Sequence, residues 1–204
     1  MTIYSAPFWI RAIYPKGLTW RVPTSKREVF LTFDDGPIPE VTPLVISILK
    51  KYNIKATFFC VGENVQKHPE VFDLLLKNGH AVGNHTFHHV KAWKTDSNSY
   101  LSEIEQCKQL VKSHLFRPPH GQINRKIAQN LMKDYRIIMW SALTGDYNQK
   151  LSGDHCLANA VNNTRPGSII VFHDSLKALE RMEFALPKYI EYCREKGYSF
   201  GILE

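Results

Sequence analysis

Hydrophobic and polar positions along the chain form two alternating patterns. Short runs of β-branched and aromatic residues recur at intervals of roughly 25 to 30 residues, and stretches with the spacing of an amphipathic helix separate them. The short runs predict strands at 28–33, 56–60, 80–84, 115–117, 136–142, 168–173 and 198–203. The stretches between them predict helices near 40–52, 69–78, 98–114, 123–134, 154–164 and 176–196.

This alternation of strands and helices predicts an α/β fold with a parallel sheet. Because crossover connections are right-handed, the strands can curl toward a closed barrel or remain an open sheet with helices on both faces. We favour an incomplete (β/α) barrel of about seven parallel strands. Residues 1–27, rich in proline and aromatic residues, predict an N-terminal strap packed on the outside of a single main domain at 28–204.

Composition narrows the class of protein. The chain has 204 residues, of which 44% are hydrophobic, enough for one domain with a sizeable core. Its formal net charge of +7 comes from scattered lysines and arginines without an aromatic-interleaved cluster, which favours a solvated surface over a nucleic-acid site. No apolar run is long enough to cross a membrane. Four widely spaced cysteines without a Cys-x-x-Cys pair predict buried free thiols: Cys60, Cys107, Cys156 and Cys193.

The first residues of the sequence bear on cellular location. They contain no basic segment followed by an apolar stretch and a small-residue cleavage site. On this ground we expect a cytoplasmic protein, whereas a leader trimmed from the sequence would allow the cell envelope or export. We also expect a monomer.

The first predicted strand ends in two adjacent carboxylates, Asp34 and Asp35, followed by Gly36-Pro37. Successive side chains at a strand end point to different sides, so one carboxylate can bind a cation while the other accepts a proton. The pair can equally serve as a turn and a helix cap, and this segment alone gives the two interpretations equal weight.

Histidines follow the third predicted strand. His85 and His89 are four residues apart and would face the same way on one helical turn, a spacing that suits two imidazoles on one metal ion. His88 and the more distant His80 compete with them as ligands. Two imidazoles and a carboxylate leave coordination positions open for water and substrate, as catalytic metal sites require.

Two further strand ends carry polar groups. Arg117 precedes Pro118-Pro119, whose rigid backbone presents it at a fixed position, and His173 emerges from a buried strand. Taken alone, Arg117 reads as a surface charge at a polyproline-type turn and His173 as a core residue or an acid–base group. All of these groups nevertheless fall at the carboxyl ends of predicted parallel strands, the edge at which such folds assemble active sites.

Together these segments resemble the polysaccharide deacetylases of the nodulation-protein-B homology type, also called carbohydrate esterase family four, over about residues 28–203. Residues 32–37 match the family's Thr-Phe-Asp-Asp-Gly-Pro element, and residues 85–89 match His-Ser/Thr-x-x-His. Residues 117–119 and 171–173 resemble its Arg-Pro-Pro and Leu-x-His motifs. The resemblance implies a distorted β/α barrel.

The resemblance also implies roles for individual residues. Asp34 would be the base, His173 the acid, and Arg117 the partner of the base. Asp35, His85 and His89, rather than His88, would hold one divalent ion, for which we expect zinc, with cobalt, nickel, iron and manganese as alternatives. The implied reaction removes N-acetyl groups from a chitin- or peptidoglycan-like carbohydrate and releases acetate. Residues expected to contact the substrate or support these groups are Pro119, His120, Trp140, Asp146 and Tyr147.

The chain departs from the family pattern at several positions. His120 replaces the usual aromatic residue, and Val171 replaces leucine. In the fourth motif Leu143 stands at the first aspartate, whereas Asp146 is kept and is followed by Tyr147 instead of tryptophan. The sequence therefore leaves open whether Asp146 or Asp174 is the carboxylate beside His173, or whether that carboxylate is missing.

Three other functions compete with this interpretation. A metal-dependent amidase would use the same site on a small N-acyl or cyclic amide. A non-catalytic sugar-binding protein would keep only the fold. A magnesium phosphatase built on Asp34 and Asp35 is disfavoured, because paired imidazoles suit zinc-like ions better.

Overall fold

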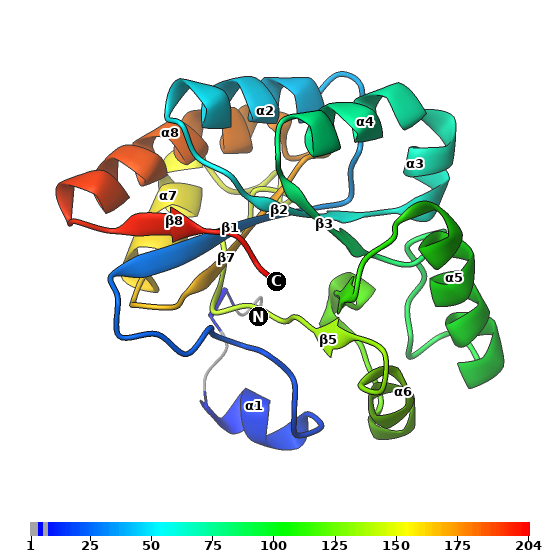
Figure 1. The fold of residues 1–204 in the computed structure, drawn as a ribbon. Helices are drawn as coiled ribbons and strands as arrows, with labels where there is room; N and C mark the ends of the chain where they lie inside the picture. The colour runs from blue at the N-terminus through cyan, green and yellow to red at the C-terminus, as the bar shows by residue number, and fades with distance from the viewer. Residues whose placement is uncertain (1–3, 6–7) are drawn as a thin grey trace.

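A curled parallel sheet forms the centre of the molecule (Figure 1). The computed structural model describes residues 4–5 and 8–204. Neighbouring strands run in the order β5-β4-β3-β2-β1-β7-β6, all pairs are parallel, and β8 pairs with the first half of β1. The incomplete barrel predicted from the sequence is confirmed. The strands are β1 (Glu28–Asp34), β2 (Thr57–Cys60), β3 (Ala81–Asn84), β4 (Leu115–Phe116), β5 (Arg136–Ile137), β6 (Ala142–Leu143), β7 (Ile169–His173) and β8 (Ser199–Gly201).

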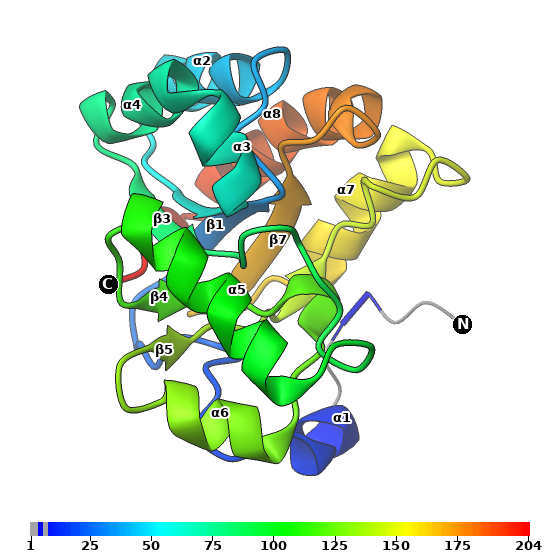
Figure 2. The same cartoon turned by 90° about the vertical axis from the view of Figure 1, so that its right-hand side faces the viewer.

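Helices cover the outside of the curled sheet (Figures 1 and 2). They are α1 (Phe8–Ile13), α2 (Thr42–Lys51), α3 (Gly62–Lys67), α4 (Pro69–Lys77), α5 (Ser97–Leu110), the 3-10 turn η1 (Pro119–Gly121), α6 (Arg125–Leu131), α7 (Gly153–Asn162) and α8 (Leu179–Glu195). The sequence did not predict α3, because this short helix buries only Gly62 and Val65 and so lacks an amphipathic repeat.

Alternation along β1 divides the core into two layers. Leu31 and Phe33 point outward to the covering helices, where the Phe33 and Phe58 rings stack with centroids 4.9 Å apart. Phe30 points to the inside of the curl and packs with Phe59, Leu115, Ile138, Ile169 and Leu203. By the same alternation Thr32 and Asp34 face the inside, which directs Asp34 toward the mouth of the curl.

The predicted strand at 136–142 is wrong in its middle part, since β5 and β6 are separate strands on opposite edges of the sheet. Between them the chain crosses the open side of the curl. There the N–H of Met139 donates to the carbonyl of Thr19 at 2.8 Å, and its carbonyl accepts from the Arg117 side chain at 3.0 Å. The apolar pattern of residues 136–142 therefore reflects burial and not a continuous strand, because the backbone of Met139 bonds to a side chain and to the N-terminal segment.

The N-terminal segment lies along this open side. Thr19 bridges to Ile138 next to β5, Arg21 bridges to Ser168 next to β7, and Ser5 bridges to Ala142 in β6. The division into a strap at 1–27 and a catalytic domain remains a prediction, and residues 1–3 and 6–7 of the strap lie outside the described part. The four cysteines are free and buried, as predicted. In residues 4–5 and 8–204 no helix is long and apolar enough to span a bilayer.

Candidate active site

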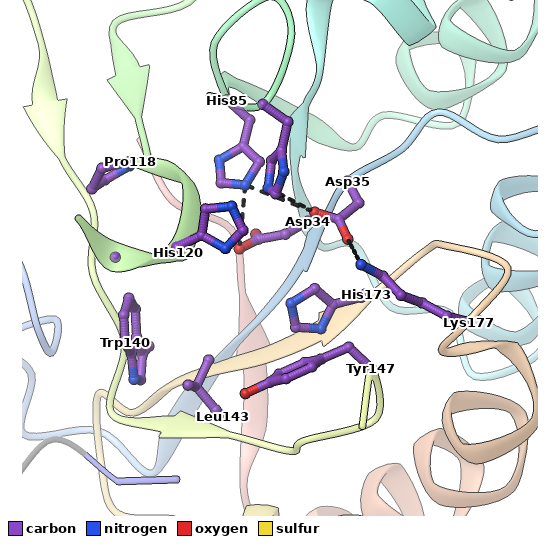
Figure 3. A pocket seen from close by; sticks show the side chains of 12 residues that line it. Asp34, Asp35, His85, Pro118, His120, Trp140, Leu143, Tyr147, His173 and Lys177 are labelled. Atoms are coloured by element: carbon purple, nitrogen blue, oxygen red, sulfur yellow. Dashed lines mark ion pairs between the residues drawn. The ribbon is translucent and has the colours of Figure 1, made fainter. Parts of the chain in front are cut away.

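A cavity of about 220 Å³ opens at the carboxyl ends of the strands (Figure 3). The fold brings to it side chains from segments that are far apart in the sequence, because neighbouring parallel strands end at one edge. Its lining consists of Asp34, Asp35, His85, His89, Pro118, His120, Gly121, Trp140, Leu143, Tyr147, His173 and Lys177.

Asp34 is held by a buried guanidinium. Arg117 Nη1 donates to Asp34 Oδ1 at 2.6 Å and to the Thr32 hydroxyl at 2.8 Å, and its other nitrogens donate to the carbonyls of Ile138 and Met139. The guanidinium also lies over the Phe59 ring at 4.1 Å. Arg117 is thus a buried cation inside the curl, held by four hydrogen bonds, and not a surface charge. The second Asp34 oxygen, Oδ2, faces His85 Nε2 at 4.0 Å.

Asp35 turns away from Asp34 toward two imidazoles. Its backbone adopts a left-handed conformation, with φ of 85°, directly before the Gly36-Pro37 turn. Asp35 Oδ1 lies 3.2 Å from His89 Nε2 and 4.0 Å from His85 Nε2. Burial disfavours its charged form, but the hydrogen bond from His89 and the surrounding histidines outweigh burial and lower the pKa of this carboxyl.

Asp35, His85 and His89 fit a metal ion. One donor atom from each residue lies within 4.8 Å of the others. His85 Nδ1 lies 2.7 Å from the carbonyl of Arg117, an arrangement that orients the ring and leaves Nε2 as the ligand atom. Burial lowers the pKa of His85 to about 4, so its imidazole is neutral near pH 7, as a ligand must be.

The expected helical turn at 85–89 is wrong, although the two imidazoles do meet. The segment is a loop in which Thr86 and His89 have left-handed backbones, with φ of 63° and 55°. His88 points elsewhere, since its Nδ1 lies 2.9 Å from Glu103 Oε1 and half of its side chain is exposed. His80 lies beside Phe58, where its Nδ1 accepts from the N–H of Ala56 at 3.2 Å.

A second ion pair lies at the end of β7, beside Asp34 on the neighbouring strand β1. His173 Nδ1 is 2.7 Å from Asp146 Oδ1, and the backbone N–H of His173 donates to Asp146 Oδ2 at 2.8 Å. Burial opposes the charged imidazole, but the Asp146 carboxylate outweighs it, with help from Asp35 and Asp34, and raises the pKa of His173 to about 9. Asp146 is therefore the carboxylate beside His173, an alternative that the sequence had left open.

Asp174 does not contact His173 in this way and makes other hydrogen bonds. Its two oxygens accept from the N–H of Gly36 at 3.0 Å and from the Thr42 hydroxyl at 2.6 Å. A Cβ at position 36 would lie 1.9 Å from Asp174 Oδ2, so only glycine fits this turn. Burial raises the pKa of Asp174 to about 8. This residue holds the turn that follows Asp35.

Apolar and aromatic side chains form the remaining wall. Trp140, Leu143 and Tyr147 line it, and the Tyr147 ring packs edge-on against His173 with centroids 4.9 Å apart. Pro118 lines the cavity, whereas the predicted Pro119 is buried and does not line it. His120 lies beside His89 with ring centroids 4.7 Å apart, and burial lowers the pKa of His120 to about 4.

Two residues near the site had no signal in the sequence. Lys177 lines the cavity, with Nζ 4.0 Å from Asp35 Oδ2. Arg181 is buried at the start of α8 and donates from Nε to the carbonyl of Asp146 at 2.7 Å. Both lie on the segment after β7. The residues of this segment are typical of a helix surface, so the sequence does not indicate that these two lie near the cavity.

Comparisons with known proteins agree with this geometry. The family model described as polysaccharide deacetylase matches residues 21–137. A peptidoglycan-N-acetylglucosamine deacetylase from Bacillus cereus is 32% identical over 198 residues, which cover 93% of each protein. A chitooligosaccharide deacetylase from Azorhizobium caulinodans is 30% identical over 167 residues, 78% of this chain and 79% of the relative.

Comparison with solved structures indicates the same family. A crystal structure of a peptidoglycan N-acetylglucosamine deacetylase with a bound N-hydroxybenzamide superposes with a TM-score of 0.88 and 33% identity, covering 97% of this chain and 94% of that one. The motifs, the curled sheet and these matches agree, so the resemblance seen in the sequence is confirmed. The chain belongs to the polysaccharide deacetylase family.

Proposed function

We propose that this protein is a metal-dependent hydrolase that removes N-acetyl groups from a chitin- or peptidoglycan-like glycan and releases acetate. One observation carries the proposal. Two imidazoles and a carboxylate converge within 4.8 Å beside Asp34, a second carboxylate that Arg117 holds in place. The family and the relatives named above support an N-acetylated carbohydrate as substrate.

Zinc is the ion that this donor set fits best. Two nitrogen ligands and one carboxylate oxygen match catalytic zinc sites, and cobalt, nickel, iron and manganese are the alternatives. When bound, such an ion polarises the acetamide carbonyl and makes nearby water more acidic. Asp35, His85 and His89 would hold it.

Two different residues carry out the two proton transfers of the proposed reaction. Asp34 Oδ1 is engaged by Arg117, so Oδ2, which faces the imidazoles, accepts the proton of the attacking water. His173 Nδ1 is engaged by Asp146, so Nε2 protonates the departing amine. The backbone amide of His120, at the cavity wall, would donate to the developing oxyanion. Trp140, Leu143 and Tyr147 exclude water from the acetyl side.

The test measures zinc content and acetate release together, for the wild-type protein and for His85→Ala and His88→Ala. His88 is a matched control, because it lies on the same loop but contacts Glu103. We expect His85→Ala to lose both zinc and activity and His88→Ala to keep both. Substrates are N-acetylglucosamine oligomers, peptidoglycan fragments and a small N-acyl amide.

Three outcomes contradict the proposal. A His85→Ala protein that retains stoichiometric zinc would remove the ligand assignment. Acetate release from the small amide alone would favour an amidase, and the absence of acetate release from every substrate would favour a non-catalytic sugar-binding protein.

A further inference from the structure

Lys177 reaches into the candidate active site from the turn between β7 and α8. Its Nζ lies 4.0 Å from Asp35 Oδ2, on the side of Asp35 away from His120 (Figure 3). The side chain is 57% exposed, so the ammonium group meets both the cavity and solvent. This position suits contact with a ligand that extends out of the cavity.

The backbone that carries Lys177 is anchored. Buried Arg181 donates from Nη2 to the carbonyl of Lys177 and from Nε to the carbonyl of Asp146. The N–H groups of Ala178 and Leu179 both donate to the carbonyl of Ser175, which closes the turn. The starting point of the Lys177 side chain is therefore fixed relative to the acid pair of His173 and Asp146.

Charge balance in the cavity explains what Lys177 can bind. Of the carboxylates in or behind the cavity wall, Asp34 is neutralised by Arg117, and Asp146 is paired with His173. Asp35 is the carboxylate left for Lys177, and it is also the one expected to bind the metal ion. With a divalent cation held by Asp35, the cavity would carry net positive charge, and the Lys177 ammonium would be directed toward the opening, where it is free to pair with an anion.

We infer that Lys177 binds a carboxylate on the sugar next to the N-acetylated unit, so that acidic glycans are preferred over neutral ones. The inference rests on the proposed function and narrows its substrate class. A lactyl ether, as in muramic acid, and a uronic acid both supply such a carboxylate. The shared chemistry is a sugar carboxylate, and substrates of both kinds separate the two sources.

The experiment compares kcat/KM for three tetrasaccharides: N-acetylglucosamine alone, alternating N-acetylglucosamine and muramic acid with free lactyl groups, and alternating N-acetylglucosamine and glucuronic acid. Lys177→Gln should lower the ratio of acidic to neutral kcat/KM about fivefold, the size of one half-exposed ion pair. Lys50→Gln is the control. It makes the same charge change at the exposed end of α2, near the amino-terminal ends of the strands.

Product binding gives a readout independent of turnover. Calorimetry with the deacetylated acidic product should show weaker binding for Lys177→Gln than for wild type and Lys50→Gln. A loss confined to one acidic substrate identifies the source of the carboxylate. An unchanged ratio with both acidic substrates, while wild type releases acetate, overturns this inference alone, whereas a wild-type protein inactive on all three overturns the proposed function.

Discussion

Two ion pairs lie side by side at the ends of the neighbouring strands β1 and β7, and they are built in opposite directions. In the first, the Arg117 side chain is 1% exposed and Asp34 is 9% exposed, so the carboxylate faces the cavity and the cation lies behind it. In the second, Asp146 is fully buried and His173 is 12% exposed, so the imidazole faces the cavity and the carboxylate lies behind it.

The difference supports the proposed roles of Asp34 as base and His173 as acid, which lie side by side. Arg117 remains charged and holds a carboxylate that has a free oxygen to accept a proton. Asp146 stabilises the charged form of an imidazole that can donate one. In each pair the buried partner holds the side chain that faces the cavity, and that side chain is the one proposed to transfer a proton.

The largest effect should come from removing the base. Asp34→Asn keeps an oxygen for Arg117 but cannot accept the proton, so we expect acetate release to fall about 10²- to 10⁴-fold. Zinc content should stay at the wild-type level, because the ligand residues are untouched. Parallel assays of zinc and acetate check this, and a near-normal rate would remove Asp34 as the base.

Removing the buried cation should cost stability. Arg117→Met leaves the Asp34 carboxylate buried without its partner, so the free energy of unfolding should fall by about 3 to 5 kcal/mol. Adding Asp34→Asn to Arg117→Met should recover part of this loss. Urea unfolding of both single variants and the double variant measures it, and purely additive losses would show that the two residues do not stabilise each other.

The second pair can be tested through pH. His173 must be protonated to act, and its pKa of about 9 keeps it charged until the pH rises through that value. In Asp146→Asn the carboxylate is absent, so the alkaline midpoint of the kcat profile should move down by about 1 to 3 pH units. His173→Ala should remove this limb. An alkaline limb at the same pH in Asp146→Asn would exclude His173 as the titrating acid.

The smallest effect should come from the brace behind the acid pair. Arg181→Lys keeps the charge but loses the Nε donor that fixes the Asp146 carbonyl, so kcat should fall roughly five- to tenfold through misplacement of His173. KM for a neutral oligomer and the melting temperature check whether the effect is specific to turnover. A loss of stability without a change in kcat would give Arg181 a purely structural role.

Much of the fold was predictable because burial leaves a local pattern. β1 is buried on both faces, so its run of apolar residues predicted a central strand without any information about the neighbouring strands. The break between β5 and β6 was not predictable, because Ile138, Met139 and Ser141 are as buried as strand residues. What marks the break is that the backbone of Met139 bonds to Thr19 and to the Arg117 side chain instead of a neighbouring strand. Those partners come from other parts of the chain.

The available groups and their place at strand ends can be read from short motifs: Asp34, Asp35, His85, His89 and His173 stand in such motifs. Which of these groups meet depends on how the chain folds. The fold joined Asp146 rather than Asp174 to His173, buried Arg117 behind Asp34, and brought Lys177 to the cavity. The reason is physical: a motif fixes side-chain chemistry and local direction, whereas pairing and burial depend on distances between segments that meet only in the folded sheet.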